Sequence, residues 1–212
     1  MLRAFLRSAV CAVLVFTPKL AFSQSVVSTV YPVESLVKSI IHETPIKSDL
    51  LLKGPQSPHS YRLKPSDLRV LETADHIFWI GDNFETFLRT PFEKIAQKVP
   101  KTSLYQAVVK DTDEHHPSHD GHNEYQNDEE HEEHANAHIW LNPDQVIHSI
   151  EIITDVLSHQ FPAYQTIFKT NKENFVHRLE DHLTEIKSRF SKLKSVPFIV
   201  YHDAYQGDNS QN

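Results

Sequence analysis

Residues 65–81, PSDLRVLETADHIFWIG, place a short helix directly before a buried strand, and the fold class follows from this pairing. Pro65 stands in the first turn of the helix expected over 65–73, where its missing N–H group is tolerated. Residues 76–80 form a continuous apolar run that ends at Gly81, which is typical of a strand inside a sheet. The stretch therefore predicts one helix-to-strand step of a larger alternating pattern.

The segments on both sides of this stretch repeat the alternation. Apolar residues recur with the 3.6-residue period of an amphipathic helix, and Asn142 and Pro143 are typical of the N-cap and N1 positions of a helix. Further strands are expected over 25–30, 47–52 and 103–109, and further helices over 33–42, 84–98 and 143–159. This order predicts an α/β fold, with a parallel sheet and helices on both of its faces.

A long helix is expected over 162–194, which contains no internal Gly or Pro. Its apolar stripe is narrow, which suits a helix that runs between two lobes. Residues 196–201 (VPFIVY) predict a single strand, and one strand cannot bury itself. We therefore expect a parallel-sheet lobe with flanking helices, a long linking helix, and a second α/β lobe that is largely missing. The expected units are the N-terminal lobe 24–160, the linking helix 161–195 and the start of a truncated C-terminal lobe, 196–212.

Residues 1–23 have the pattern of a cleaved secretory signal peptide. Arg3 and Arg7 precede an apolar run over 8–16, and the small residues Ala21 and Ser23 form a small-x-small site for cleavage after Ser23. The apolar run is shorter than the roughly 20 residues that a helix needs to cross a bilayer. We therefore expect export to the periplasm. The mature chain would be more acidic than the full sequence, because the removed segment carries basic residues and no acidic ones.

The composition of the chain excludes several classes of site. Its 212 residues carry a formal net charge of -7 and include 15 His, 4 Gly and 1 Cys. The single Cys11 rules out an intrachain disulfide framework and a cysteine zinc cluster. The sequence contains neither GxGxxG nor GxxxxGKS/T, the glycine-rich motifs that bind nucleotide phosphates. If the protein binds a metal ion, histidine must supply the ligands.

Residues 111–137 hold ten Asp or Glu and six His but no Lys or Arg. The segment has almost no apolar side chain to bury, so we expect an irregular loop. Its imidazoles, mostly spaced three or four apart, and its carboxylates favour weak, exchangeable binding of a divalent cation. The loop histidines are His115, His116, His119, His122, His131 and His134. A solvated acidic spacer is the alternative interpretation of this segment.

Three other histidines share a position relative to the expected elements. His59 follows one expected strand, His138 precedes an expected helix, and His202 directly follows another strand. In parallel α/β sheets, ligands bind beyond the carboxyl ends of the strands. Three imidazoles gathered there would bind zinc at about 2.0–2.1 Å and leave a fourth position open. The alternative for each of them is a hydrogen-bonded histidine in a turn or in the core.

Three motifs follow one another in the chain: PHSYRLKPSDLRVLETADHIFWIG (58–81), HIWLNP (138–143) and FIVYHDAY (198–205). An acidic, histidine-rich loop precedes the second motif, and a long expected helix separates it from the third. With this order, the sequence resembles the periplasmic solute-binding proteins of bacterial zinc ABC importers, within the cluster of metal-binding receptors. The resemblance covers 25–205, although Pro58 stands where these receptors often have an acidic residue.

This resemblance implies two α/β lobes joined by a rigid helix, with zinc bound in the cleft between them. His59, His138 and His202 fall on the family's three metal histidines. Related manganese receptors usually have an acid at the third position, so His202 favours zinc. The implied protein is a monomer that captures zinc in the periplasm and delivers it to an ABC permease. It is not an enzyme, and it has no nucleic-acid partner.

Two other functions stay open from the sequence. A soluble periplasmic zinc buffer, or a non-functional truncated remnant, would need only the first lobe and the loop 111–137. A zinc hydrolase would share the three histidines and the open position, but it would also need a general base near the metal. The sequence has no HExxH motif, and Asp203 is adjacent to His202, so the two side chains point to opposite faces of a strand end.

Overall fold

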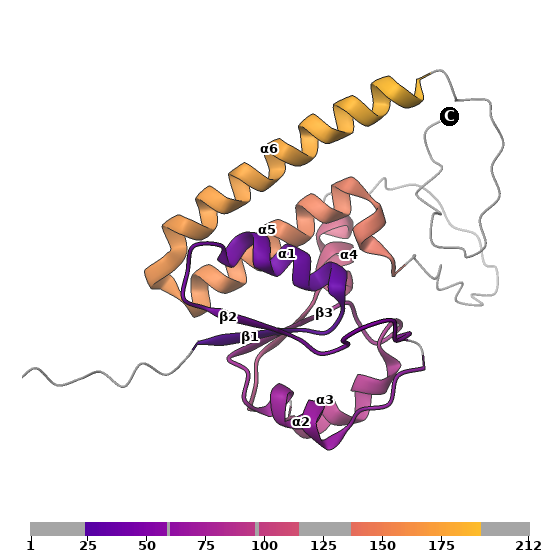
Figure 1. Cartoon of the computed structure of the whole chain (residues 1–212), viewed down its shortest axis with the longest axis vertical. Coiled ribbons are helices and arrows are strands. Elements are labelled where there is room, and N and C mark those ends of the chain that lie inside the picture. Colours follow the sequence, from indigo (N-terminus) through magenta and orange to yellow (C-terminus); the bar gives the residue numbers. More distant parts are fainter. Residues whose placement is uncertain (1–23, 59, 96–97, 115–136, 192–212) are drawn as a thin grey trace, which may run out of the picture.

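The fold is built on a four-stranded parallel sheet (Figure 1). The computed structural model describes residues 24–58, 60–95, 98–114 and 137–191. Its strands are β1 (Ser25–Ser28), β2 (Lys47–Leu50), β3 (His76–Trp79) and β4 (Lys101–Ser103). They lie in the order β2-β1-β3-β4, and each of these pairings is parallel. The predicted α/β fold with a parallel sheet is therefore confirmed, whereas the expected signal peptide and second lobe lie outside the described residues.

Helices cover both faces of the sheet (Figure 1). On one side lie α1 (Tyr31–Ile41), α4 (Leu104–Glu114) and α5 (Pro143–Gln160), and on the other lie α2 (Pro65–Glu72) and α3 (Arg89–Ile95). Short 3-10 helices occur at η1 (Thr86–Leu88), η2 (Ile139–Leu141) and η3 (Pro162–Tyr164). Each strand of the sheet is thus followed by a crossover on one face or the other, as the alternating sequence predicts.

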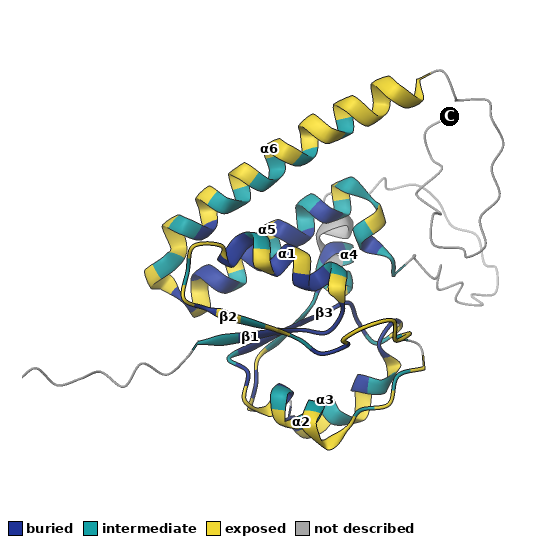
Figure 2. Cartoon of the chain, viewed as in Figure 1, coloured by how far each residue is buried: buried dark blue, intermediate teal, exposed yellow. Residues whose placement is uncertain are grey.

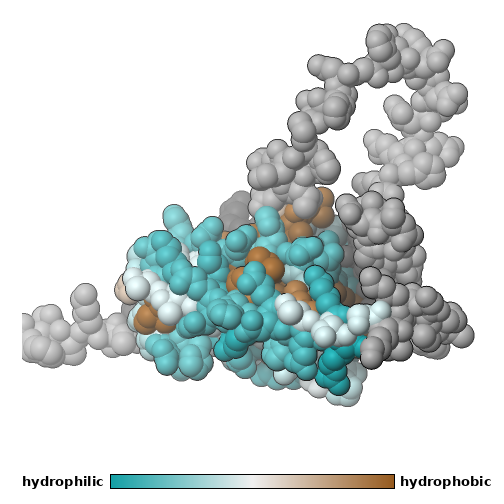
Figure 3. Space-filling view, turned by 90° about the horizontal axis from the view of Figure 1, so that it is seen from above, coloured by the Kyte–Doolittle hydropathy of each residue, from teal (hydrophilic) through white to brown (hydrophobic). Residues whose placement is uncertain are grey.

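The core lies between the sheet and its helices (Figure 2). In the central strands β1 and β3, Val26, Val27, Ile77 and Phe78 are at most 1% exposed. Burial on both faces explains why apolar residues are adjacent in these strands, as Val26–Val27 and Ile77–Phe78, and do not alternate with polar ones. The outer face seen in Figure 3 is mainly hydrophilic, and apolar residues show there only in small separate areas.

The prediction of a strand over 103–109 is wrong, because β4 ends at Ser103 and α4 begins with the next residue. Leu104 and Val108 are both buried, at the four-residue spacing of one helix face. The Ser103 hydroxyl also accepts a hydrogen bond from the N–H of Gln106 at 3.2 Å, as an N-cap side chain does. A serine at the strand end therefore starts a helix directly.

Two further boundaries differ from the expected ones. The helix α4 continues to Glu114, so it overlaps the first residues of 111–137, the segment expected to be an irregular loop. The helix expected over 84–98 is observed as η1 followed by α3, because residues 81–85 form a hydrogen-bonded turn. Pro91 lies in the first turn of α3, where a missing N–H group is tolerated.

The long helix α6 (Gln165–Phe190) lies within the predicted range 162–194. Its first half packs against α1 and α5, and its second half extends away from the lobe (Figure 1). In this second half, Ile186 and Phe190 are 50% and 59% exposed. The role of α6 as a link to a second lobe stays a prediction. Among the residues described, no helix is long and apolar enough to span a bilayer.

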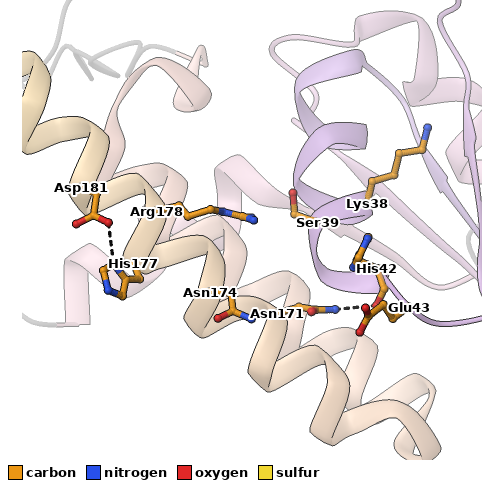
Figure 4. Close-up of a pocket in the computed structure, with 9 residues that line it drawn as sticks. All are labelled: Lys38, Ser39, His42, Glu43, Asn171, Asn174, His177, Arg178 and Asp181. Atoms are coloured by element: carbon orange, nitrogen blue, oxygen red, sulfur yellow. Dashed lines mark hydrogen bonds and ion pairs between the residues drawn. The ribbon is translucent and has the colours of Figure 1, made fainter.

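One side chain of α6 caps the C-terminal end of α1 (Figure 4). The Asn171 amide donates hydrogen bonds to the carbonyl oxygens of Ile40 and His42, at 2.9 and 2.8 Å. Carbonyls in the last turn of a helix lack an intrahelical donor, so this amide satisfies acceptors that would otherwise need water. Glu43 follows with a φ of 63°, the left-handed conformation that commonly ends a helix. A polar groove of about 650 Å³ lies beside this contact.

We expect Asn171→Ala to lower the free energy of unfolding by about 1–2 kcal/mol, because two carbonyl acceptors lose their donor. Urea denaturation followed by circular dichroism measures the change. Asn174→Ala is the matched control, since Asn174 is exposed and lines the same groove about one turn further along α6. Equal effects of the two substitutions would show that the helix cap contributes nothing.

His76 is buried where β3 begins, at the amino end of the sheet. Its Nε2 atom lies 2.9 Å from the hydroxyl of Thr102, and its ring packs against Phe78 with the centroids 4.7 Å apart. The Nδ1 atom is buried, and no described residue forms a hydrogen bond with it. Burial lowers the pKa of His76 to about 4, so the imidazole is neutral at pH 7. His76 is thus a packing residue of the core.

The burial of His76 makes the stability of the fold dependent on pH. The unfolded chain binds a proton at the ordinary His pKa of 6.5, so the free energy of unfolding falls as the pH drops from 6.5 toward 4. Between pH 7 and pH 5 the wild type should lose about 2 kcal/mol that His76→Gln does not lose. Urea unfolding at both pH values measures the difference, and His159→Gln, at an exposed position, is the control substitution. An identical pH dependence of wild type and H76Q would contradict a neutral, buried imidazole.

Candidate metal site

The carboxyl ends of β1 and β3 are joined by one buried side chain, Glu85. Its carboxylate accepts hydrogen bonds from the main-chain N–H groups of Ile80 and Gly81, both at 2.9 Å, and from the hydroxyl of Thr29. The N–H of Glu85 donates back to the carbonyl of Gly81, also at 2.9 Å. Residues 81–85 therefore form a closed turn whose side-chain acceptor reaches the neighbouring strand.

Gly81 leaves room in this turn for the Ser103 side chain at the end of β4. Its φ is 156°, and a Cβ atom at this position would lie 3.0 Å from the Oγ atom of Ser103. The Ser103 hydroxyl in turn donates a hydrogen bond to the carbonyl of Ile80 at 2.8 Å. A Cβ atom at position 81 would therefore have to displace the Ser103 hydroxyl slightly from its bond with Ile80.

Burial raises the pKa of Glu85 to about 7. The hydrogen bonds from Thr29, Gly81 and Ile80 act in the opposite direction, because they stabilise the carboxylate, and the nearby charge of Asp82 adds to the increase. Desolvation is the largest of these effects, since Glu85 is 0% exposed. Near neutral pH the side chain therefore populates both its acid and its carboxylate form.

His138 lies near these strand ends in a cluster of three aromatic rings. The centroids are 5.4 Å apart for Phe84 and His138, 5.3 Å for Phe84 and Trp140, and 5.1 Å for His138 and Trp140. All three pairs meet edge to face, the arrangement that aromatic rings prefer. We call these three residues the aromatic cluster. Because Phe84 belongs to the turn 81–85, the cluster is attached to the end of β3.

The main chain of His138 is fixed by the elements that follow it. Its carbonyl accepts a hydrogen bond from the N–H of Leu141 at 2.9 Å, which closes η2. The side chain of Asn142 then accepts hydrogen bonds from the N–H groups of Asp144 and Gln145, at 2.9 and 3.3 Å. Its predicted role as the N-cap of the helix that follows, α5, is therefore confirmed. The main chain that carries the imidazole is thus fixed by η2 and by the capped helix α5 that follows it.

The chain directly after His59 is anchored to the lobe, although His59 itself lies outside the described residues. The Tyr61 hydroxyl donates a hydrogen bond to the carboxylate of Asp67 at 2.7 Å, and Asp67 also accepts one from the N–H of Lys64 at 2.7 Å. The Tyr61 ring packs edge to face on Phe87, with the centroids 5.2 Å apart. Burial, together with the bond to Asp67, raises the pKa of Tyr61 to about 12. This segment is therefore tied to α2 and to η1.

Of the predicted metal ligands, His138 is the one that lies in the described part of the chain. His59, His202 and the six loop histidines fall outside it, and among the described residues no three His, Cys, Asp or Glu side chains converge as a metal site. The three-histidine site and the weaker loop sites therefore stay predictions. Sequence reasoning missed Glu85, whose available signal was one acidic residue in the otherwise uncharged run 83–88, just after a strand and its glycine.

Solved structures of other proteins share this fold. Zn(II)-bound AdcA from Streptococcus pneumoniae matches with a TM-score of 0.67 and 23% identity, over 87% of this chain and 36% of its own. The metal-dependent lipoprotein YcdH from Bacillus subtilis matches with a TM-score of 0.68 and 19% identity, over 87% of this chain and 62% of its own. The class that these likenesses and the architecture define is an α/β protein built on a parallel sheet.

The chain belongs to the family described as "Zinc-uptake complex component A periplasmic", whose family model matches residues 26–207. The high-affinity zinc uptake system protein ZnuA of Yersinia pestis is 26% identical over 206 residues, which are 92% of this chain and 64% of that protein. The zinc-binding protein AdcA of Streptococcus pyogenes serotype M3 is 28% identical over 193 residues, 85% of this chain and 36% of that protein. The chain thus spans less than two thirds of these relatives, and the family predicted from its three motifs is confirmed.

The raised pKa of Glu85 predicts a second pH effect on stability. The unfolded chain has the ordinary pKa of 4.5, so the stability that Glu85 contributes is complete below pH 4.5 and is lost as the pH rises through 7. Glu85→Gln stays neutral, and it should gain about 3 kcal/mol over the wild type between pH 4.5 and pH 8. Urea denaturation measures this gain, with Glu34→Gln as the control at another buried carboxyl. Parallel curves for wild type and E85Q would contradict the raised pKa.

Proposed function

We propose that this protein is an extracytoplasmic solute-binding protein that captures Zn²⁺ and delivers it to an ABC permease. The observation that carries the proposal is the position of His138. Its imidazole packs on Phe84 and Trp140 next to the turn that ends β3, in a chain of the zinc-uptake family. Parallel α/β sheets bind their ligands beyond the carboxyl ends of the strands, and His138 is a side chain able to ligate a metal at this edge.

The proposed site consists of His59, His138 and His202. Neutral imidazole is a good zinc ligand, and three of them leave a fourth position open, which suits an ion that must be released again. A nitrogen ligand at the third position favours zinc over manganese, which prefers oxygen. The edge-to-face packing of His138 restricts its ring before metal arrives, and less rotamer entropy is then lost on binding.

The proposed compartment is the periplasm, which the chain would reach through cleavage of residues 1–23. The printed names of its relatives describe zinc uptake and zinc binding, which supports zinc as the cargo. The loop 111–137 would add weak, exchangeable zinc sites beside the specific one. The protein would act as a monomer, with the permease as its partner and without a catalytic step.

Single substitutions His59→Ala, His138→Ala and His202→Ala should each weaken zinc binding more than about hundredfold, since loss of a metal ligand exceeds the loss caused by a supporting residue. Competition against a calibrated chelator measures the affinity. The background is the full chain with the six loop histidines replaced by Asn, so that the loop does not contribute. His42→Ala is the control, because His42 is an exposed histidine at the α1–α6 groove.

The same titration distinguishes the ways in which the proposal can fail. Near-native affinity in all three variants would remove the site. A loss confined to H138A would show that His138 binds zinc with other partners. Equal affinity of the unsubstituted background for Mn²⁺ and Zn²⁺ would contradict zinc as the preferred cargo.

A further inference from the structure

Glu85 and Phe84 are neighbours in sequence, but their side chains enter different environments. The Glu85 carboxylate lies in the strand ends, where three donors converge on it. The Phe84 ring packs on His138 and on Trp140, with the centroids 5.4 and 5.3 Å away. One short piece of backbone therefore joins a buried hydrogen-bond centre to the ring that contacts the candidate ligand.

We infer that Glu85 is a positioning residue for His138 and that it acts through Phe84. The inference rests on the proposed function, because it concerns the zinc affinity of His138. The hydrogen bonds of Glu85 hold the turn 81–85 against the strand ends, and this fixes the backbone that carries Phe84. Phe84 and Trp140 in turn limit the rotation of the imidazole, so the ligand is kept in one orientation.

The Glu85 carboxyl group is not needed to close the turn, but it attaches the turn to the neighbouring strand. The N–H groups of Phe84 and Glu85 both donate to the carbonyl of Gly81, at 3.0 and 2.9 Å, so the main chain closes the turn without any side chain. The side chain adds the bond from Thr29, which belongs to the end of another strand. Removal of the carboxyl group should therefore leave the turn in place and loosen its attachment to β1.

The test compares Glu85→Ala with Glu85→Gln in the full chain that lacks the six loop histidines. Gln keeps an acceptor for the N–H groups and can bond the Thr29 hydroxyl, whereas Ala removes all three bonds. We expect E85A to weaken zinc binding about tenfold, the lower end of the range typical of residues that support a metal ligand, and E85Q to stay below that range, within about threefold of the unsubstituted background. Glu34→Ala is the matched control, because Glu34 is also buried but accepts from Ser48 and pairs with Lys38.

A double-mutant cycle tests the route through Phe84. Phe84→Leu should weaken zinc binding by a similar factor, and E85A added to F84L should weaken it by no more than about twofold further, because both changes remove the same support. Full additivity of the two losses would show that Glu85 does not act through Phe84.

A spectroscopic readout separates positioning from general loss of stability. The imidazole resonances of His138, recorded by NMR without zinc at a temperature where each variant is folded, should shift in E85A and stay in place in E34A. If E85A does not fold, Thr29→Val gives the same test, since it deletes one donor and nearly keeps the side-chain shape. Its expected result is a shifted His138 resonance and an affinity loss above the threefold limit set for E85Q, up to about tenfold.

His138→Ala keeps the two levels of the argument apart. If H138A retains the zinc affinity of the background, the proposed site fails, whatever Glu85 does. If H138A abolishes tight binding while E85A, or T29V in its place, binds zinc as the background does, the positioning role of Glu85 is overturned and the proposed site stands.

Discussion

Three buried donors at the ends of β1 and β3 require an acceptor inside the lobe, and Glu85 supplies it. A buried donor without a partner costs about 1–3 kcal/mol. By accepting from all three donors, this one carboxyl group avoids that cost at each of them. Its bonds hold the turn that follows β3, the turn carries Phe84, and Phe84 packs on His138. The candidate ligand is therefore connected by these contacts to the end of the sheet.

A second buried titratable group, His76, lies at the opposite end of β3, where the strand begins. His76 opposes protonation and Glu85 opposes ionisation, because burial disfavours the charged form of each. Acidification from neutral pH therefore destabilises the fold at His76 while it relieves the unfavourable charge at Glu85. Between about pH 5 and pH 7 the two contributions have opposite slopes, and the net stability of the lobe changes less than either group alone would make it change.

The layers of the fold could be predicted because burial on both faces leaves continuous apolar runs such as 76–80. The segment 103–109 could not be assigned in this way, since a short apolar run fits a strand or a helix equally well. In the structure, the Ser103 hydroxyl accepts a hydrogen bond as the N-cap of α4, and this favours the helix over the strand. His138 was identifiable from its motif. The role of Glu85 was not, because its contact with Thr29 joins residues 56 positions apart that no local pattern relates.

One helix, α1, connects the candidate site to the long helix α6. A single residue separates Thr29 from the start of α1, and the last carbonyls of α1 are held by Asn171 of α6. Near its start α1 is fixed to β2, since Glu34 accepts a hydrogen bond from Ser48 at 2.6 Å. A regular helix does not absorb displacement as a loop does. A continuous series of contacts therefore runs from α6 through α1 to Thr29, and through the Thr29 hydroxyl to the Glu85 carboxylate.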